Sequence, residues 1–446
     1  MKQPNVVFID CHDLGDWLGC YDRPDVSTPN LDRLAFQGAR FSQFIATAPI
    51  CIPSRVGLYC SQMPHMIGVW GQFPYADDAV CMARYFQDAG YETVLSNRLM
   101  ILNDPSWAGF SRVIEGKAGV EVLAERFLRE EVPSIERPFF LQVSFSEVHR
   151  PFGLDYDPDL AERMVVPPDL PDCSEVRKDL AALCRQIGAL DKKVGRILNA
   201  LDDRGLADET VVVFTTEHGV ATARAKHTLY DAGIRTTLLM RYPSEIAPGA
   251  VYGDLISNLD LLPTVMDLCG LEEPDGILGR SFRELFSGVG WAGRSVVFAE
   301  QTWGRRSGNW YYTPMRCVRS DQFKLIRNFA RVPNYVDNGW VNRFQNRREV
   351  VQALFSSPAP ERELYSLTDD PYELNNVADD PRFSKVRDDL EGQLAAFLEE
   401  TEDPILMGVV PNREGHPDVP QWIKQSDGSF LLEADREIYH SEQPFD

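Results

Sequence analysis

The sequence indicates its fold first in a short stretch near the N-terminus, residues 5–16, which read NVVFIDCHDLGD. An apolar, β-branched run of this kind is typical of a strand that is buried on both faces, as in a parallel sheet. The run passes directly into Asp10, His12, Asp13 and Asp16. Because functional groups gather at the carboxyl ends of parallel strands, the stretch predicts a central strand that leads into a polar site.

Apolar strands and helical segments continue to alternate beyond this stretch. Strands are expected at residues 92–96, 138–145, 209–219 and 236–243, and helices at residues 28–38, 80–89 and 174–203. This alternation predicts an α/β fold in which helices sandwich a large, mostly parallel sheet. We expect this larger, catalytic domain to span residues 1–290.

The pattern changes near residue 290. A strand at 296–302 and the alternating stretch 315–329 indicate antiparallel pairing, and a closing helix is expected at 383–400. We therefore expect residues 291–446 to form a smaller α+β domain with an antiparallel sheet. This domain is expected to complete the substrate pocket and to end in a polar tail.

Composition narrows the class of protein. The chain of 446 residues is 44% hydrophobic and 25% charged, with a net charge of −22. Such an acidic chain is not expected to bind nucleic acid or an anionic membrane surface. The nine cysteines are scattered and form no CxxC pair. The sequence also shows no signal-peptide pattern and no apolar run of ~18–20 residues. Together these features predict a cytoplasmic protein with free thiols. The oligomeric state is left open, a homo-oligomer included.

Acids and histidines cluster at three predicted strand exits, within residues 10–16, 147–150 and 217–227. Adjacent carboxylates and imidazoles at neighbouring strand ends can converge on a divalent cation. The alternative for any single exit is that its acids cap helices or face solvent in a loop. Two such pairs on parallel strands favour a metal site.

A separate motif, residues 51–55 (CIPSR), reads as the start of a helix. Cys51 is expected at the N-cap, and Pro53 falls in the first turn, where its missing N–H costs nothing. Arg55 lies one helical turn below Cys51 and supplies forked donors for an oxyanion, and a helix N-terminus favours anions. The motif predicts a nucleophile beside an anion cradle; the alternative is a buried cysteine at a helix start.

Motifs spread over residues 4–405 match one family pattern. The segment 51–65 has the form C-x-P-S-R, an apolar helix and Pro-His. Further motifs are FTTEHG (214–219), RAKHTLYDAGIR (224–235), PMRCVRSDQFKLIRN (314–328) and ELYSLTDDPYELNNVADDP (363–381). The chain resembles the sulfatase family of the alkaline-phosphatase superfamily. Its HD start, its RAKHTLYD loop and the segment YYTPMRCVR are similar to the sulfamidase, or heparan N-sulfatase-like, branch.

The resemblance implies catalytic roles for four residues. Cys51 would be converted to formylglycine by a maturation enzyme that reads C-x-P-x-R, and the hydrated aldehyde would be the nucleophile toward sulfur. Arg55 would steady this nucleophile, and Lys226 would neutralise a sulfate oxygen. His149 would hydrogen-bond the substrate or protonate the leaving group.

The resemblance also implies one divalent metal ion. Asp13, Glu217 and His218 would bind it, with His12 as the fourth ligand and Asp10 as its competitor, since strand alternation puts both on one side. The family usually has two aspartates at the first pair and usually binds Ca²⁺. Two imidazoles with two carboxylates suit Mn²⁺ or Zn²⁺ better than Ca²⁺, so a transition ion is favoured here.

One family motif departs from its usual form. Where the family has GKWHLG, this chain reads SNRLMIL at residues 96–102, so Arg98 stands for the lysine and Met100 for the histidine. Arg98 can still bind an oxyanion, but the missing imidazole gives more weight to His149. His227, next to Lys226, is a candidate to fill the gap; the alternative is a loop histidine that faces solvent.

The C-terminal part is locally basic, with ten Lys and Arg residues between positions 305 and 348 against two Asp. This excess either recognises an anionic group of the substrate, with Arg316 as a candidate contact, or pairs with acids of the first domain. Trp303 is a candidate for stacking on a sugar or aromatic ring. The alternative places Trp303 in an interdomain core.

These features predict an enzyme that hydrolyses a small sulfate ester or sulfamate and releases inorganic sulfate. A cytoplasmic enzyme meets small imported molecules, so a small anionic substrate is expected rather than a polymer. One alternative is a phosphonate or phosphate-ester hydrolase of the same superfamily. Another is a non-catalytic sulfate-binding protein in which Cys51 stays a thiol.

Overall fold

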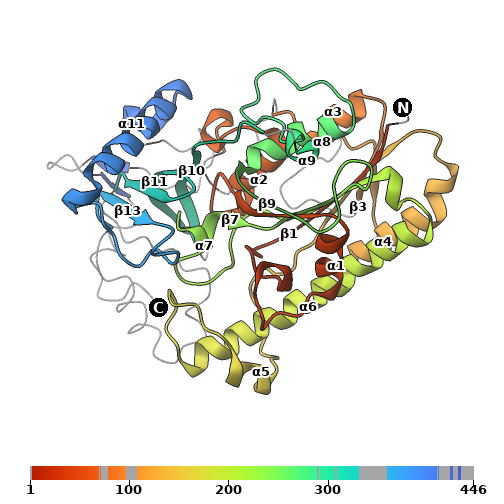
Figure 1. Ribbon diagram of the computed structural model, residues 1–446, viewed down its shortest axis with the longest axis horizontal. Coiled ribbons are helices and arrows are strands. Elements are labelled where there is room, and N and C mark those ends of the chain that lie inside the picture. Colours follow the sequence, from red (N-terminus) through yellow and green to blue (C-terminus); the bar gives the residue numbers. More distant parts are fainter. Residues whose placement is uncertain are drawn as a thin grey trace.

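The computed structural model describes residues 3–69, 71, 79–96, 108–288, 291–306, 309–330, 359–408, 410, 422–424 and 430–432. Its two larger sheets hold nine and four strands. The nine-stranded sheet lies between two layers of helices, and the four-stranded sheet lies beside it (Figure 1).

Strand β1 lies at the centre of the nine-stranded sheet, which has the order β4-β3-β5-β1-β6-β8-β2-β7, with β9 beside β2. The strands are β1 (Asn5–Cys11), β2 (Ala39–Ile45), β3 (Glu92–Ser96), β4 (Arg112–Ile114), β5 (Phe139–Ser144), β6 (Thr210–Thr216), β7 (Arg235–Thr236), β8 (Leu238–Arg241) and β9 (Ala250–Ser257). β1 pairs in parallel with β5 and β6, and β3 pairs in parallel with β4 and β5. Only β7 and β8 run antiparallel to their partners in this sheet, so the predicted large, mostly parallel sheet is confirmed.

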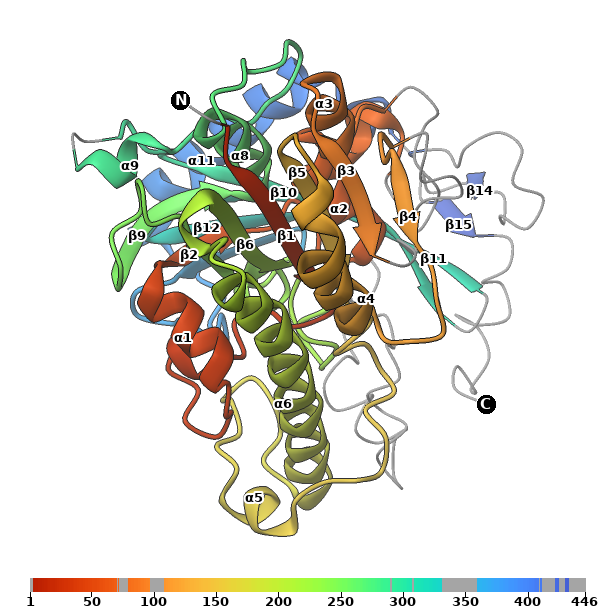
Figure 2. The ribbon, with the colours of Figure 1, turned by 90° about the vertical axis from the view of Figure 1, so that its right-hand side faces the viewer.

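Helices cover both faces of the sheet (Figure 2). One face carries α1 (Pro29–Gln37), α4 (Val120–Arg126) and α6 (Ser174–Asp203), and the other carries α2 (Cys51–Cys60), α3 (Met82–Asp88) and α8 (Leu261–Leu268). Successive side chains of a strand point to opposite faces. Accordingly, Val7 and Ile9 of β1 join the core under α6, whereas Val6 and Phe8 join the core under α2.

The second sheet is antiparallel, with the order β10-β11-β12-β13. Its strands are β10 (Val297–Arg306), β11 (Asn309–Arg319), β12 (Phe323–Asn328) and β13 (Arg362–Ser366). Helix α11 (Ser384–Glu400) packs on one face, where Leu394 meets the core that contains Trp303. The other face packs on the catalytic part, where Cys317 shares a cluster with Leu229. The predicted C-terminal antiparallel sheet is confirmed, and the boundary at residue 290 stays a prediction.

Individual elements follow the sequence closely. The helix predicted at 174–203 has these bounds in the structure, and the helices predicted at 28–38 and 80–89 are shorter by one or two residues at each end. All nine cysteines are free of disulfides, as predicted. Among the described helices, we find none with the length and apolarity that a membrane crossing requires.

Candidate active site

Helix α2 carries Cys51 at its start, at the edge of the nine-stranded sheet. The helix begins at Cys51 itself, after the extended residue Ile50, so Ile50 rather than Cys51 is the N-cap. Pro53 lies in the first turn, as predicted. The Cys51 side chain is 7% exposed, which leaves it reachable only through the site around it.

The side chain of Asn258 links the first turn of helix α2 to Thr47, in the segment that precedes the helix. Its Nδ2 donates to the carbonyl of Ser54 at 3.1 Å, and its Oδ1 accepts the N–H of Thr47 at 3.1 Å. Gly57 permits the approach, because a Cβ at this position would collide with the Asn258 side chain. Sequence reasoning missed Asn258, although it lies inside the capping box Ser257–Asp260.

Two predicted strand exits meet at the carboxyl edge of the sheet. Cys11 of β1 is paired in register with Thr216 of β6. The pairs His12–Asp13 and Glu217–His218 therefore leave neighbouring parallel strands side by side. The N–H of Gly15 donates to the carbonyl of His218 at 3.0 Å, which holds the two exit loops together.

The side chains of these pairs converge on one point. Ligand atoms of His12, Asp13, Cys51 and Glu217 all lie within 4.8 Å of one another, and all four residues are buried. Nδ1 of His12 lies 2.9 Å from Oε1 of Glu217, yet neither atom makes a hydrogen bond with any described residue. Two buried polar atoms in this relationship fit a shared cation.

His218 is oriented as a metal ligand would be. Its Nδ1 donates to the carbonyl of Gly219 at 2.8 Å, so Nε2 is the ring nitrogen that faces the cluster. Nε2 lies 3.3 Å from Oδ1 of Asp13 and 3.5 Å from Oε1 of Glu217. Burial opposes ionisation of Glu217, but His12 and Arg55 outweigh it and hold the pKa of this carboxyl well below its usual value.

The guanidinium of Arg55, on helix α2, reaches Asp10 near the end of strand β1. Its Nη1 donates to Asp10 and, at 2.7 Å, to the hydroxyl of Tyr59, and its Nη2 lies 3.6 Å from Oε2 of Glu217. The other oxygen of Asp10 accepts from Ser144 at 2.6 Å. Both Asp10 oxygens are thus engaged, and Asp10 lies behind the converging ligand atoms; its role as a ligand stays a prediction.

The Cys51 thiol lies in a field that favours its anion. Its Sγ lies 3.4 Å from Nε2 of His218. Burial opposes ionisation, but the charge of Lys226 and hydrogen bonds from His12 and His218 lower the pKa of Cys51 well below that of an ordinary thiol. Any negatively charged group at this position is stabilised in the same way.

Lys226 lies between the buried Asp13 and the exposed His149. Its Nζ lies 2.9 Å from both oxygens of Asp13 and 3.4 Å from Nε2 of His149. Burial opposes its protonation, but Asp13 outweighs the burial and raises the pKa of Lys226, so the amine is charged. His149 is exposed, and its Nδ1 donates to the carbonyl of Arg150 at 2.6 Å, so its Nε2 can accept from Lys226.

His227 is buried, not solvent-facing. Its side chain is 3% exposed, its backbone adopts a φ of +72°, and its Nδ1 has no hydrogen-bond partner in the described part of the chain. Its N–H donates to the carbonyl of Pro49 at 3.0 Å, beside the start of α2. Burial, reinforced by Lys226 and His218, lowers the pKa of His227 well below its usual value, so the imidazole is neutral.

Three other candidate residues are placed differently. Arg98 lies outside the described residues. Trp303 is fully buried in the core under α11, which lies within the C-terminal part and is not the interdomain core of its alternative interpretation. Arg316 is 1% exposed, and its guanidinium forms a fork with Asp403 at 2.5 and 2.9 Å. These positions correct the prediction that Trp303 and Arg316 face the substrate, because both side chains are enclosed by the C-terminal part.

The basic stretch forms ion pairs wherever its side chains are described. Arg319 binds the carboxylate of Asp231 with two bonds of 2.9 Å, and Nζ of Lys324 lies 2.8 Å from Glu373. Arg327 pairs with Glu391 at 3.2 Å. Pairing with acids therefore accounts for the described cations, and residues 331–350 lie outside the described residues.

Family comparison agrees with this fold and site. A sequence model of the sulfatase family matches residues 4–271, and one described as N-sulphoglucosamine sulphohydrolase, C-terminal, matches residues 216–337. The chain belongs to the sulfatase family. It is accordingly an enzyme of the class that hydrolyses sulfuric esters or sulfamates.

Individual relatives span nearly the whole chain. The human N-sulphoglucosamine sulphohydrolase is 26% identical over 473 residues, covering 90% of this chain and 91% of the human protein. An ulvan-active sulfatase of Formosa agariphila is 26% identical over 415 residues, covering 90% and 81% of the two chains. A solved structure in complex with its substrate D-glucosamine-2-N,6-O-disulfate has a TM-score of 0.70 at 18% identity, covering 90% of this chain and 99% of that one.

Proposed function

We propose that this chain hydrolyses a small sulfate ester or sulfamate at position 51, after a maturation enzyme has converted Cys51 to formylglycine. The observation that carries the proposal is the position of Cys51. Its Sγ lies 3.4 Å from Nε2 of His218, inside a buried group of metal-type donors. A structural cysteine at a helix start requires no such surroundings.

The donor set fits one divalent ion. His12, Asp13, Glu217 and His218 would hold it. The donor atoms of the first three converge, and Nε2 of His218 lies 3.3 Å from Asp13 and 3.5 Å from Glu217. His12 Nδ1 and Glu217 Oε1 lack hydrogen-bond partners in the described part of the chain. Two imidazole nitrogens with two carboxylates favour Mn²⁺ or Zn²⁺ over Ca²⁺. Bound there, the ion would supply a Lewis acid for the sulfate oxygens.

Residues of this chain supply the remaining chemistry. Formylglycine would provide a hydrated aldehyde as the nucleophile. The buried ammonium of Lys226 neutralises charge on a sulfate oxygen, and it is held in place by Asp13. Arg55 orients the site from below through Asp10 and Glu217. The exposed His149 would give a proton to the departing oxygen or nitrogen.

A sulfamate is the first substrate to test. The C-terminal match to the N-sulphoglucosamine sulphohydrolase family and the similarity to the human enzyme over 90% of the chain support it. The buried neutral imidazole of His227 offers a second hydrogen-bonding group beside Lys226. We infer that the substrate is a small anionic molecule, and we keep the cytoplasm as its predicted location.

The deciding experiment combines mass and activity. The chain is co-expressed with a formylglycine-generating enzyme, and conversion should lower the mass of the Cys51 peptide by about 18 Da. Matured enzyme is then assayed with a sulfamated amino sugar, an aryl sulfate and a phosphonate diester. Sulfate release from either of the first two supports the proposal. Turnover of the phosphonate alone, or a Cys51 that stays a thiol in an active preparation, would overturn it.

A further inference from the structure

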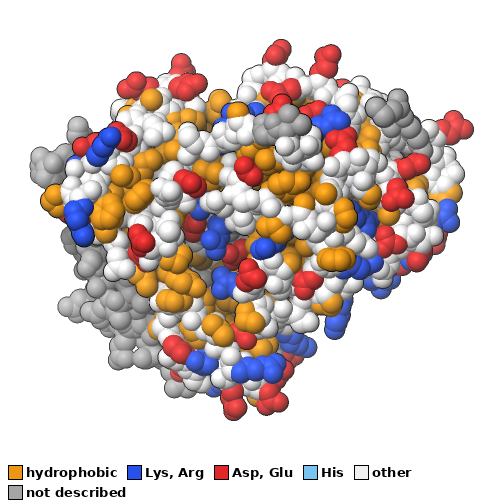
Figure 3. Space-filling model, in the orientation of Figure 1, with side chains coloured by type: hydrophobic (Ala, Val, Ile, Leu, Met, Phe, Trp, Pro, Cys, Tyr) orange, Lys and Arg blue, Asp and Glu red, His pale blue; other side chains and the backbone are white. Residues whose placement is uncertain are grey.

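A second cleft opens next to the active site. It lies between the first exit loop, residues 167–170, the loop 220–224 and residues 371–373 of the C-terminal part. Figure 3 shows a hollow at the centre of this face, with basic side chains inside it. None of the residues that line the cleft belongs to the converging metal donors or is Cys51.

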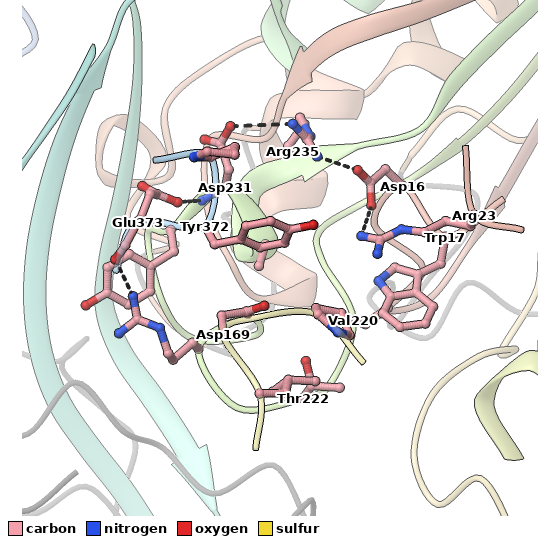
Figure 4. Close-up of a pocket in the computed structure, with 16 residues that line it drawn as sticks. Asp16, Trp17, Arg23, Asp169, Val220, Thr222, Asp231, Arg235, Tyr372 and Glu373 are labelled. Carbon is pink, nitrogen blue, oxygen red and sulfur yellow. Dashed lines mark hydrogen bonds and ion pairs between the residues drawn. The ribbon is translucent and has the colours of Figure 1, made fainter. Parts of the chain in front are cut away.

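The charges that line the cleft largely neutralise one another. Asp16 accepts from Arg23 at 3.2 Å and from Arg235 at 2.6 Å (Figure 4). Arg224 lies 4.0 Å from the ring of Tyr230, and its Nη2 donates to the carbonyl of Glu373 at 2.7 Å. Arg23 and Arg235 are therefore already paired with a carboxylate, which makes the cleft a poor receptor for a sulfate group.

The groups that remain suit hydroxyl groups. Asp169 forms no ion pair with any described residue, and burial raises the pKa of its carboxyl, which a hydroxyl donor would relieve. In Figure 4, the ring of Tyr372 lies above Asp169, and Thr222 lies below both. Tyr372 is 40% exposed, so its ring is available for stacking.

An exposed tyrosine ring beside a carboxylate without an ion pair matches the two surfaces of a sugar: its C–H face and its hydroxyl rim. From this arrangement we propose that the cleft is a second carbohydrate site, which binds an uncharged pyranose ring. Such a ring would stack on Tyr372 while it donates to Asp169. The active site, with the buried ammonium of Lys226, selects the anionic group instead.

The cleft and the active site share their walls. The carbonyl of Val220, which lines the cleft, accepts the N–H of Lys226 at 3.1 Å. Asp16 and Asp13 likewise belong to one exit loop. A sugar in the cleft would therefore steady the turn that holds Lys226. The proposal does not depend on formylglycine or on a bound metal.

Saturation-transfer NMR on the full chain tests the site with three probes: methyl β-D-glucopyranoside, methyl β-D-galactopyranoside and inorganic sulfate. We expect at least one pyranoside to bind, to stay bound in Cys51→Ala, and not to be displaced by sulfate. Asp169→Asn and Tyr372→Ala should each weaken its binding by about tenfold, as expected for loss of a hydrogen bond to a charged group or of a stacking surface.

A matched control is Asp389→Asn, an exposed aspartate on α11, which should bind like the unmodified chain. Thermal unfolding of each variant establishes that it is folded, and Asp169→Asn keeps the shape of the side chain in any case. Absence of binding by both pyranosides, displacement by sulfate, or unchanged binding in both cleft variants would each overturn the proposal. Loss of sulfatase activity with intact pyranoside binding would instead count against the proposed function alone.

Discussion

The Sγ atom of Cys51 lies 3.4 Å from Nε2 of His218, although the two residues are 167 positions apart in the sequence. Cys51 arrives on a helix start and His218 on a loop that follows a parallel strand. Their meeting joins the proposed nucleophile to the proposed metal shell, and it makes the chemistry of position 51 testable.

Replacement of Cys51 by Ala should abolish turnover. We expect kcat/KM for the sulfamate to fall by about 10³-fold or more, because the nucleophile is removed while the fold is kept. The matched control is Cys173→Ser at the N-cap of α6, a position where serine is favoured. Activity of this control should stay within about twofold, given that no site group is touched. Normal turnover in Cys51→Ala would contradict the assignment.

Lys226→Met should lower kcat more than it changes KM. Loss of a buried charge that acts on the developing negative charge typically costs about 10²-fold in rate. Lys226→Arg should restore part of the activity, since it keeps the charge near Asp13. Lys385→Met, on α11, serves as the control. An unchanged kcat in Lys226→Met, measured under saturating sulfamate, would rule out the role.

Metal removal should inactivate the enzyme and lower its melting temperature. Elemental analysis is expected to find about one transition ion per chain, because the four donors form one site. Binding to the native state stabilises it by about 2.7 kcal/mol at a hundredfold excess over Kd. Glu217→Gln should lose most of the bound metal, whereas Glu272→Gln, in an exposed loop, should retain it. Stoichiometric Ca²⁺ in active enzyme would contradict the preference for a transition ion.

Arg316→Met should destabilise the fold without changing KM. The variant removes the forked partner of the buried Asp403 and leaves only the more distant His65, at 3.5 Å, as a described cationic neighbour; breaking a buried ion pair typically costs about 3–5 kcal/mol. Urea unfolding and steady-state kinetics on the same preparation measure the two effects. Arg382→Met, whose ion pair with Asp380 is on the surface, should unfold as the unmodified chain does. A raised KM with unchanged stability would restore Arg316 as a substrate contact.

Stability should fall at alkaline pH through His65, which lies between the catalytic part and the C-terminal sheet. Its Nδ1 contacts Glu300 and lies 3.5 Å from Asp403. Burial lowers the pKa of His65, but Glu300 and Asp403 outweigh the burial and the nearby Arg316, so the pKa is raised. A histidine whose pKa is higher in the folded state adds to the free energy of unfolding. This contribution is complete below the pKa of the unfolded state, about 6.5, and is lost as the pH rises through the pKa of the folded state.

We expect the unfolding free energy to decline between pH 6 and pH 9. Glu300→Gln should remove much of this dependence, since it removes the charge that favours the imidazolium. Urea titrations at the two pH values, with Asp389→Asn as the control, measure it. The same slope in the unmodified chain and in Glu300→Gln would show that another group is responsible.

Much of the site was visible in the sequence because its residues lie at predictable places. Strand alternation and turn signals located the exits that carry Asp13 and Glu217, and the CIPSR motif located Cys51. The partners of Arg316 and Trp303 were not predictable. Which acid meets Arg316 depends on how η9 (Pro404–Met407), whose N-cap is Asp403, folds back onto β11, and no local pattern contains that information.

By itself, the sequence determined the layered α/β architecture, the C-terminal antiparallel sheet and the helix start at Cys51, because hydrophobic periodicity and turn chemistry act over a few residues. The tertiary structure alone decided which side chains share a site. It left Asp10 outside the converging donor atoms, buried His227 and enclosed Arg316. The reason is that burial and charge pairing depend on packing between segments that are hundreds of residues apart, where the strand order sets every distance.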